Sequence, residues 1–384
     1  MAWEKKLKKN ICTIEQLKNY IKLSTKEERQ LRKVIARHPM SITHYYASLI
    51  DWSNPNDPIR RMVVPHVEEL NLTGSYDTSG ELENTKMPGL QHKYSQTALI
   101  ITTSRCATYC RYCFRKRLIG LSTREILHRF EDATDYIKKH KEINNVLLSG
   151  GDPFVLPTVV LEKFLKSLSS IPHLDFIRFG TRIPVTFPDR ILENKTLLTL
   201  LRKYSLKKRR IYVVTQFNHP REITSKSTET VSRLLSSGVI LNNQTVLLKG
   251  VNDKPHTLAE LQEKLVRIGV NPYYVFQCRP VKRVKYRFQD TLYRGYHIVE
   301  GAKKMLDGHS KRFKYIMSHR TGKIEIVGIT NRDIYFKYHQ AKDLRNNGKF
   351  FKRRLDNTAG WLEDLSQHRF LSSILQKTLR FLFP

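Results

Sequence analysis

The chain has 384 residues, of which 40% are hydrophobic, so it can bury a sizeable core and need not be disordered. No apolar run approaches the ~18 residues that a transmembrane helix needs, and the N-terminus lacks the apolar core of a signal peptide. We therefore expect a cytoplasmic protein with no membrane association, whose five cysteines stay reduced.

The formal net charge of +33 is extreme and would attract polyanions such as RNA. The densest basic runs are Lys207–Arg210, Arg279–Arg287 and Lys349–Arg354. No motif of the RRM, KH or zinc-finger type is present. Nucleic-acid binding is therefore possible from the charge but is not predicted, because a solvated basic surface explains the same composition.

The N-terminal region, residues 1–95, is expected to be helical and then to approach the core as ordered but irregular chain. Thr13 with Gln16, and Thr25 with Glu28, have the spacing of a capping box at a helix start. The later part of the region is rich in Asn, Asp, Pro and Gly, which favour turns.

Residues 96–290 alternate short β-branched runs with segments of helical periodicity, the pattern of βα units around a parallel sheet. The expected strands are Ala98–Thr103, Asn145–Ser149, Phe176–Gly180, Ile211–Thr215, Thr245–Leu248 and Tyr273–Gln277. Polar residues follow each strand, and a parallel sheet would gather them on one face. The pattern predicts an α/β fold, a full or partial TIM-type (β/α) barrel of about six βα units, with a doubly wound sheet as the alternative.

The C-terminal part is expected to contain two pieces. Residues 291–330 include Lys323–Val327, whose alternation is typical of a strand. Residues 331–384 turn polar and basic and end in an amphipathic stretch through Leu382. We expect this last piece to be an appendage of unassigned role.

Three of the five cysteines, Cys106, Cys110 and Cys113, lie together in a stretch of eight residues, and the segment around them is strongly basic. A C-x3-C-x2-C triplet offers three thiolates, so a [4Fe–4S] cluster on it would keep one iron open for chemistry. The positive charge would offset the charge of such a cluster. The alternatives are a zinc site, which lacks an obvious fourth ligand nearby, and three unligated buried cysteines, for which the segment is too polar.

The triplet, with Tyr112 before its last cysteine, resembles the signature of radical S-adenosylmethionine (SAM) enzymes. In that superfamily the methionine end of SAM chelates the open iron, and reduction releases a 5′-deoxyadenosyl radical. The stretch "LLSGGDPF", one βα unit later, resembles the second-strand glycine motif that receives the methionine amine. The resemblance implies a [4Fe–4S] cluster, SAM and an electron donor. It assigns cofactor binding to Ser149, Gly150, Gly151 and Asp152.

Within that superfamily the chain is similar to the lysine 2,3-aminomutases from about Trp3 to Gly328. The matching pieces are "MSITHYYASLID", "NDPIRRMVVP", "CRYCFRKR", "LSGGDPF", "GTRIPVTFPDRI", "FNHPREIT", "NNQTVLLKGVND" and "NPYYVFQC". The resemblance implies an isomerase that moves an amino group between Cα and Cβ of a small-molecule amino acid. Its substrate would form an aldimine with pyridoxal 5′-phosphate (PLP), and the nitrogen would migrate through a cyclic radical.

The resemblance also implies roles for single residues. Lys323 matches the lysine that holds PLP, a role that needs a desolvated, nucleophilic amine; an exposed lysine at a strand start is the alternative. Arg115 matches the arginine that pairs with the substrate carboxylate. Ser149, Gln216 and Gln244 match positions close to SAM.

The chain departs from the family pattern at both ends of the expected site. An arginine pair that normally holds the pyridoxal end is replaced by Lys93 and Thr97. Two acidic residues that hold the distant ammonium of lysine are replaced by Arg279 and Ile316. Because a cation facing a cation is disfavoured, the substrate is not expected to be free lysine. Arg279 would suit an anionic side chain, as in a glutamate 2,3-aminomutase, or it simply belongs to the basic run around it.

Two further hypotheses belong to other functional classes. A radical SAM enzyme acting on RNA or protein without PLP would account for the charge and for the altered cofactor positions. A non-catalytic nucleic-acid-binding protein with a structural cluster would account for the charge alone. A homo-oligomer is possible in each case.

Overall fold

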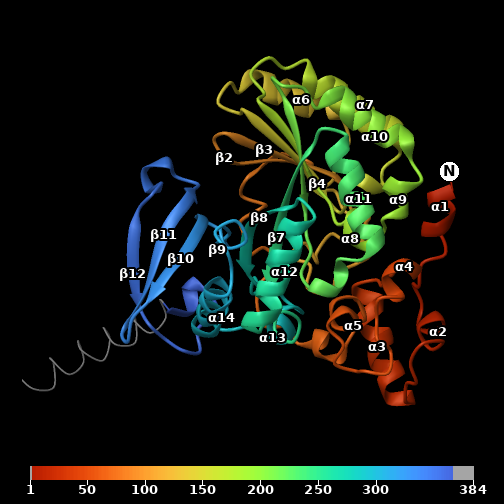
Figure 1. Cartoon of the computed structure of the whole chain (residues 1–384), viewed down its shortest axis with the longest axis vertical. Coiled ribbons are helices and arrows are strands. Elements are labelled where there is room, and N and C mark those ends of the chain that lie inside the picture. Colours follow the sequence, from red (N-terminus) through yellow and green to blue (C-terminus); the bar gives the residue numbers. More distant parts are fainter. Residues whose placement is uncertain (1, 366–384) are drawn as a thin grey trace, which may run out of the picture.

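The computed structural model describes residues 2–365, and its N-terminal region is helical as predicted (Figure 1). The capping box of Thr13 with Gln16 is confirmed. The second box is formed by Ser24 and Glu27, one residue before the expected pair, because Ser24 is the residue whose backbone is still extended. The helices here are α1 (Ala2–Leu7), α2 (Ile14–Leu17), α3 (Thr25–Arg37), α4 (His44–Ala47), α5 (Pro58–Val63) and the 3₁₀ turn η1 (Val67–Leu70).

The six expected strands all form, with ends that differ by a few residues. They are β3 (Thr97–Thr103), β4 (Asn145–Gly150), β5 (Phe176–Gly180), β6 (Arg210–Thr215), β7 (Ile240–Leu247) and β8 (Asn271–Gln277). The helices that follow them are α6 (Phe130–Lys139), α7 (Thr158–Ser169), α8 (Ile183–Thr186), α9 (Asp189–Leu192), α10 (Lys195–Tyr204), α11 (Ser225–Ser236), α12 (Pro255–Arg267), α13 (Lys285–Phe288) and α14 (Leu292–Lys304), with 3₁₀ turns η2 (Pro153–Val155) and η3 (Pro220–Glu222).

The sheet runs in strict chain order from β1 to β12, and β3 to β8 pair in parallel, as do β8 and β9 (Lys314–His319). A doubly wound sheet would reverse its strand order at one point, and this one does not. Right-handed crossovers in one direction place every helix on the same face, and Figure 1 shows α6, α7, α10 and α11 along the outside of β3–β7. The first and last strands do not pair with each other, so the fold is a partial (β/α) barrel.

Antiparallel strands extend the sheet at both ends. β1 (Thr85–Met87) and β2 (Leu90–Tyr94) precede β3, so the expected boundary after residue 95 falls in the β2–β3 turn. β10 (Gly322–Ile329), β11 (Asp333–Ala341) and β12 (Phe350–Arg354) follow β9, with the 3₁₀ turn η4 (Leu344–Asn346) between the last two.

The interpretation of residues 331–384 as an appendage is therefore corrected for the part that the structure describes. The boundary after residue 330 lies in the β10–β11 turn, between paired strands. Phe336 and Trp361 are buried in a second hydrophobic core with residues of α12, α14 and β8. The polar, basic composition hides the alternation in the sequence, because Lys337 on β11 and Lys352 and Arg354 on β12 are exposed. The amphipathic stretch through Leu382 lies outside the described residues.

A first, larger core fills the space between the parallel strands, their helices and the N-terminal helices. Within residues 2–365, no helix is both long enough and apolar enough to span a bilayer.

Candidate active site

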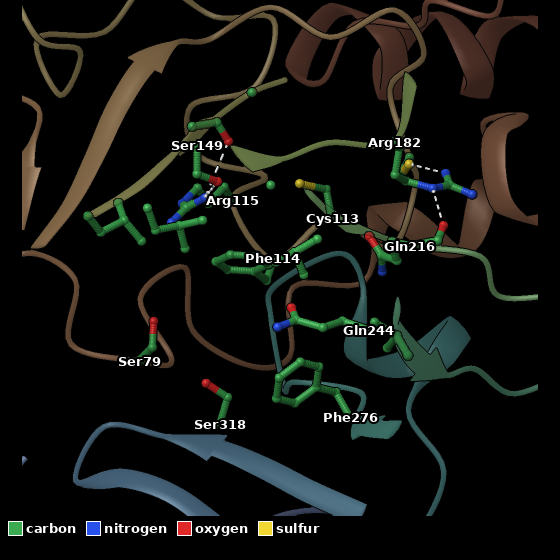
Figure 2. A pocket seen from close by; sticks show the side chains of 18 of the residues that line it. Ser79, Cys113, Phe114, Arg115, Ser149, Arg182, Gln216, Gln244, Phe276 and Ser318 are labelled. Atoms are coloured by element: carbon green, nitrogen blue, oxygen red, sulfur yellow. Dashed lines mark hydrogen bonds between the residues drawn. The ribbon is translucent and has the colours of Figure 1, made fainter. Parts of the chain in front are cut away.

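A cavity of about 350 Å³ lies at the carboxyl ends of the parallel strands and contains the predicted site residues (Figure 2). Parallel strands end on the same edge, so polar residues far apart in the sequence meet there. Among the lining residues are all of those expected from the sequence: Cys106, Cys110, Cys113, Arg115, Ser149, Gly150, Gly151, Asp152, Gln216, Gln244, Arg279 and Lys323.

The three cysteines follow β3 and line one wall of the cavity. Burial raises the pKa of Cys113 to about 11 and raises that of Cys106 as well, so a bound metal would have to displace their protons. Across residues 2–365, no three His, Cys, Asp or Glu side chains converge as ligands of a single metal ion would.

Four basic residues within and directly after the cysteine triplet are neutralised by two buried carboxylates. Arg111 and Lys116 both contact Glu69, at 2.7 and 2.5 Å. The carboxylate of Glu81 accepts from the arginines at 115 and 117. Less of this charge is therefore left to offset the thiolates than the sequence suggests. The ion pairs with Glu69 and Glu81 also fasten the cysteine segment to the N-terminal region.

A cation from another strand contacts a cysteine directly. Arg182, just after β5, donates from Nη1 to Sγ of Cys110 at 2.7 Å. Its other nitrogens donate to Glu222, to the Tyr46 hydroxyl and to the backbone oxygen of Gln216. This network holds the guanidinium rigidly beside the sulfur, where it would stabilise a thiolate.

The glycine pair after β4 allows two loops to touch. A Cβ on Gly151 would lie 2.2 Å from the backbone oxygen of Arg105, and Gly150 has a φ of 116°. Asp152 then accepts hydrogen bonds from Thr181 Oγ1 and from the Arg182 amide. Its carboxylate joins the loops after β4 and β5 at the rim of the cavity.

Polar side chains from three further strands point into the same space (Figure 2). Arg115 donates from Nη1 to Ser149 Oγ at 3.1 Å and from Nε to Glu81 at 2.9 Å. Gln216 follows β6, and Gln244 lies on β7. The residues that the resemblance assigns to SAM and to the substrate carboxylate are thus neighbours.

Lys323, on β10, reaches into the cavity from the antiparallel extension of the sheet. Its Nζ donates to Gln340 Oε1 at 2.8 Å and lies 5.0 and 5.6 Å from the ring centres of Tyr94 and Tyr274. Burial, followed by the charges of Arg178 and other nearby cations, lowers its pKa to about 7. A large fraction of this amine is therefore neutral and nucleophilic near neutral pH, unlike an ordinary exposed lysine.

Arg279 follows β8 and lies over the ring of Phe114 at 4.1 Å. One Nη donates to Ser318 Oγ at 2.8 Å, and the other is buried without a hydrogen-bond partner. Burial lowers the pKa of Arg279 to about 10. The guanidinium thus has an unused donor in a part of the cavity where Glu81 and Arg115 are its main charged neighbours.

Comparison with known proteins agrees with this geometry. The family model described as the Radical SAM superfamily matches residues 100–261. A protein of Aquifex aeolicus named "Putative L-lysine 2,3-aminomutase" is 43% identical over 360 residues, which cover 94% of this chain and 96% of that protein. The chain belongs to the lysine 2,3-aminomutase family.

Other relatives carry two different substrate names. L-lysine 2,3-aminomutase of Clostridium subterminale is 38% identical, over 81% of this chain and 73% of that protein. Glutamate 2,3-aminomutase of Clostridioides difficile is 36% identical, over 77% of this chain and 68% of that protein. A solved radical SAM methyltransferase of Sphaerobacter thermophilus aligns with 59% of this chain and 68% of its own at 13% identity, with a TM-score of 0.38. As an aminomutase-family member, the protein is an isomerase-type radical SAM enzyme, and the superfamily implies SAM and a [4Fe–4S] cluster.

Of the residues that differ from the lysine 2,3-aminomutase pattern, some line the cavity and one does not. Lys93 and Thr97 both line the cavity, and the charge of Lys93 acts on Lys323. Ile316 is fully buried and lies outside the cavity lining, whereas Ser318 on the same strand contacts Arg279. The position matched to the second acidic residue is therefore not a cavity position in this member of the family.

Three charged residues of this aminomutase-family site were missed by the sequence reasoning: Glu81, Arg178 and Arg182. Arg182 lies in the matched piece "GTRIPVTFPDRI" and directly follows an expected strand, so its position carried a signal. Arg178 is an inward-facing cation inside a strand, which its alternation with buried Ile177 and Phe179 could have indicated. Glu81 lies in an irregular segment, where no sequence signal points to the cavity.

Proposed function

We propose that the protein is a PLP-dependent 2,3-aminomutase whose substrate is an amino acid with an anionic side chain, such as glutamate, and not free lysine. The observation that carries the proposal is the presence of Lys323, with its lowered pKa, in the same cavity as the three cysteines. A radical enzyme without PLP has no need of a desolvated lysine there.

The two cofactor ends of the cavity fit the groups that they would hold. Cys106, Cys110 and Cys113 would bind three irons of the cluster, and the backbone of the glycine turn lines the same cavity, where the methionine end of SAM would bind. The flat faces of Tyr94 and Tyr274 beside Lys323 would pack against a pyridine ring. When bound, the cluster with SAM supplies a hydrogen-abstracting radical, and PLP delocalises the unpaired electron during nitrogen migration.

The residues between these ends would position the substrate. Arg115 would bind the α-carboxylate, because its Nη1 faces the cavity beside Ser149 while Glu81 holds the rest of its guanidinium in place. The enclosing strands and the Phe114 ring would keep water away from the reacting carbons. This chain's contribution is thus orientation and exclusion of water.

The charge around Arg279 favours an anionic side chain. A substrate ammonium at about 4 Å from this guanidinium would be repelled by about 4 kcal/mol at an effective dielectric constant of 20, and a carboxylate would be attracted by a similar amount. Glu81 is already paired with two arginines, so it does not compensate Arg279 fully. The free Nη of Arg279 offers the hydrogen bond that a side-chain carboxylate would accept.

The experiment uses reconstituted protein under anaerobic conditions, with reductant, SAM, PLP and a pool of the common amino acids. Mass spectrometry follows 5′-deoxyadenosine and β-amino isomers. We expect a β-isomer of glutamate or of another acidic amino acid. Cys110→Ala should lose both products, whereas Lys323→Ala should lose the isomer and keep cleavage of SAM.

The other outcomes contradict separate parts of the proposal. A β-isomer of lysine would overturn the substrate assignment while leaving the aminomutase intact. Deoxyadenosine with no amino-acid isomer would overturn the aminomutase and favour a radical enzyme that modifies RNA or protein without PLP.

A further inference from the structure

The inner end of the cavity contains an arginine that no carboxylate neutralises. Arg178 lines the cavity from β5, and within residues 2–365 it forms no ion pair with Asp or Glu. Its Nη2 donates to Asn145 Oδ1 at 2.5 Å, whereas its Nε is buried without a hydrogen-bond partner. A buried charge with an unused donor is costly, and burial lowers the pKa of this guanidinium.

Arg178 is one of three cations that act on the amine of Lys323. Arg178 is the first of the charged neighbours that lower the pKa of Lys323, followed by Lys93 and Arg279. Lys93 donates only to the backbone oxygens of two residues, at 2.6 and 3.1 Å, and has no carboxylate partner in the described part of the chain. Glu81 and Asp77 offset part of the charge of Lys93 and Arg279, but no carboxylate is among the groups that shift the pKa of Lys323 or Arg178. A positive potential therefore remains at this end of the cavity, and a bound anion would relieve it.

We propose that Arg178 binds the phosphate group of the phosphorylated carbonyl cofactor that Lys323 holds. The inference rests on the proposed function, because it takes Lys323 as the cofactor lysine. A guanidinium presents its N–H groups as a fork that matches two phosphate oxygens. Thr97 Oγ1 donates to the same Asn145 oxygen at 3.2 Å, so a hydroxyl lies at this end of the cavity, and it would have to turn away from Asn145 to donate to a phosphate oxygen.

A carboxylate of the substrate is the other source of negative charge for this site. The two sources differ in what must be present, since a phosphate arrives with the cofactor and a carboxylate arrives with the amino acid. Binding of the cofactor alone, without any amino acid, therefore distinguishes them.

The test compares PLP with pyridoxal, which lacks the phosphate, on cluster-loaded protein freed of PLP. Absorbance titrations give the apparent Kd of each compound, and inorganic phosphate is added as a competitor. The variants are Arg178→Gln and Arg178→Met. Arg209→Gln is the matched control, because Arg209 donates to backbone oxygens outside the cavity lining.

Both Arg178 variants should bind PLP about 10- to 100-fold more weakly, the loss expected for a charged hydrogen bond, and should bind pyridoxal as the wild type does. Competition by inorganic phosphate should weaken in parallel, and the control should match the wild type. Because Arg178 is unpaired in the free protein, Arg178→Met should melt at the same temperature or higher without ligand. A purely structural arginine would instead lower the melting temperature of both variants.

An unchanged preference for PLP over pyridoxal in the Arg178 variants would overturn the inference and leave the proposed function standing. Weaker binding of glutamate, with unchanged binding of PLP, would also overturn it and assign the arginine to the substrate carboxylate. If wild-type protein binds neither PLP nor pyridoxal, both the inference and the proposed cofactor fail.

Discussion

At the scale of single residues, burial rather than residue type decides the chemistry of the cavity. Lys323 and Lys93 both have a pKa lowered to about 7, because burial disfavours the ammonium and neighbouring cations add to the effect. Of these two lysines, Lys323 is the one whose amine lies over two aromatic rings and donates a hydrogen bond to a side-chain amide. The backbone oxygens that accept from Lys93 make it the less available nucleophile.

The lowered pKa makes a direct prediction about the reactivity of Lys323. An amine reacts with an acylating reagent only when it is neutral, so labelling of Lys323 should rise between about pH 6 and 8, with a midpoint near 7. Peptide mass spectrometry after a short pulse of reagent measures the rate, and exposed Lys26 is the reference in the same digest. If the two lysines label in step over the whole pH range, the amine of Lys323 is not depressed and its suitability for a cofactor bond is lost.

At the scale of elements, a buried carboxylate fastens the cysteine segment to the N-terminal helices. Glu69, in η1, accepts from Arg111 and Lys116, and Arg111 also donates to the backbone oxygens of His38 and Pro39. These contacts fix the loop that carries the cysteines before any metal binds. The N-terminal helices thus contribute to the site although none of their residues was expected there.

Glu69→Gln should lower the free energy of unfolding by about 3–5 kcal/mol, because it leaves two buried cations without their counter-charge. Urea denaturation measures the loss, and Glu28→Gln, in an exposed ion pair, should cost much less. The pKa of Glu69 is lowered to about 2 in the folded protein, so its contribution is complete above about pH 4.5 and is lost as the pH falls towards 2. A loss for Glu69→Gln no larger than the control would show that these contacts do not fasten the segment.

At the scale of the whole molecule, the antiparallel extension β9–β12 helps to form the cavity. They bring Lys323 to the cavity, and Gln340 on β11 holds its amine. A second core, which includes Trp361, fixes these strands against α14 and the last parallel strands.

Trp361→Ala should therefore destabilise the protein by about 3–5 kcal/mol, the usual cost of removing a large buried side chain. Phe350→Ala is the control, since that side chain is 57% exposed. Thermal and urea unfolding compare the two variants. Equal and small effects would instead support the sequence expectation that the polar C-terminal region is an appendage.

Much of this arrangement could be predicted from local sequence. The strands that carry Ser149, Gln216 and Gln244 are marked by short β-branched runs, and parallel strands necessarily end on one edge. The cysteine triplet is a local pattern with a local chemical meaning. The contacts of Arg178 and Arg182 could not be read in the same way, because their partners come from other strands and loops.

The sequence by itself determined the α/β class, the cysteine and glycine motifs and the candidate lysine, because each depends on residues close together in the chain. Tertiary structure alone decided which charged side chains form ion pairs and which keep donors without a partner. Glu69 and Glu81 form ion pairs with four cations near the cysteines. Arg178 and Arg279 each keep a buried N–H group without a hydrogen-bond partner. Electrostatic partners depend on distance in space, and a pKa depends on burial, so neither can be read from spacing along the chain.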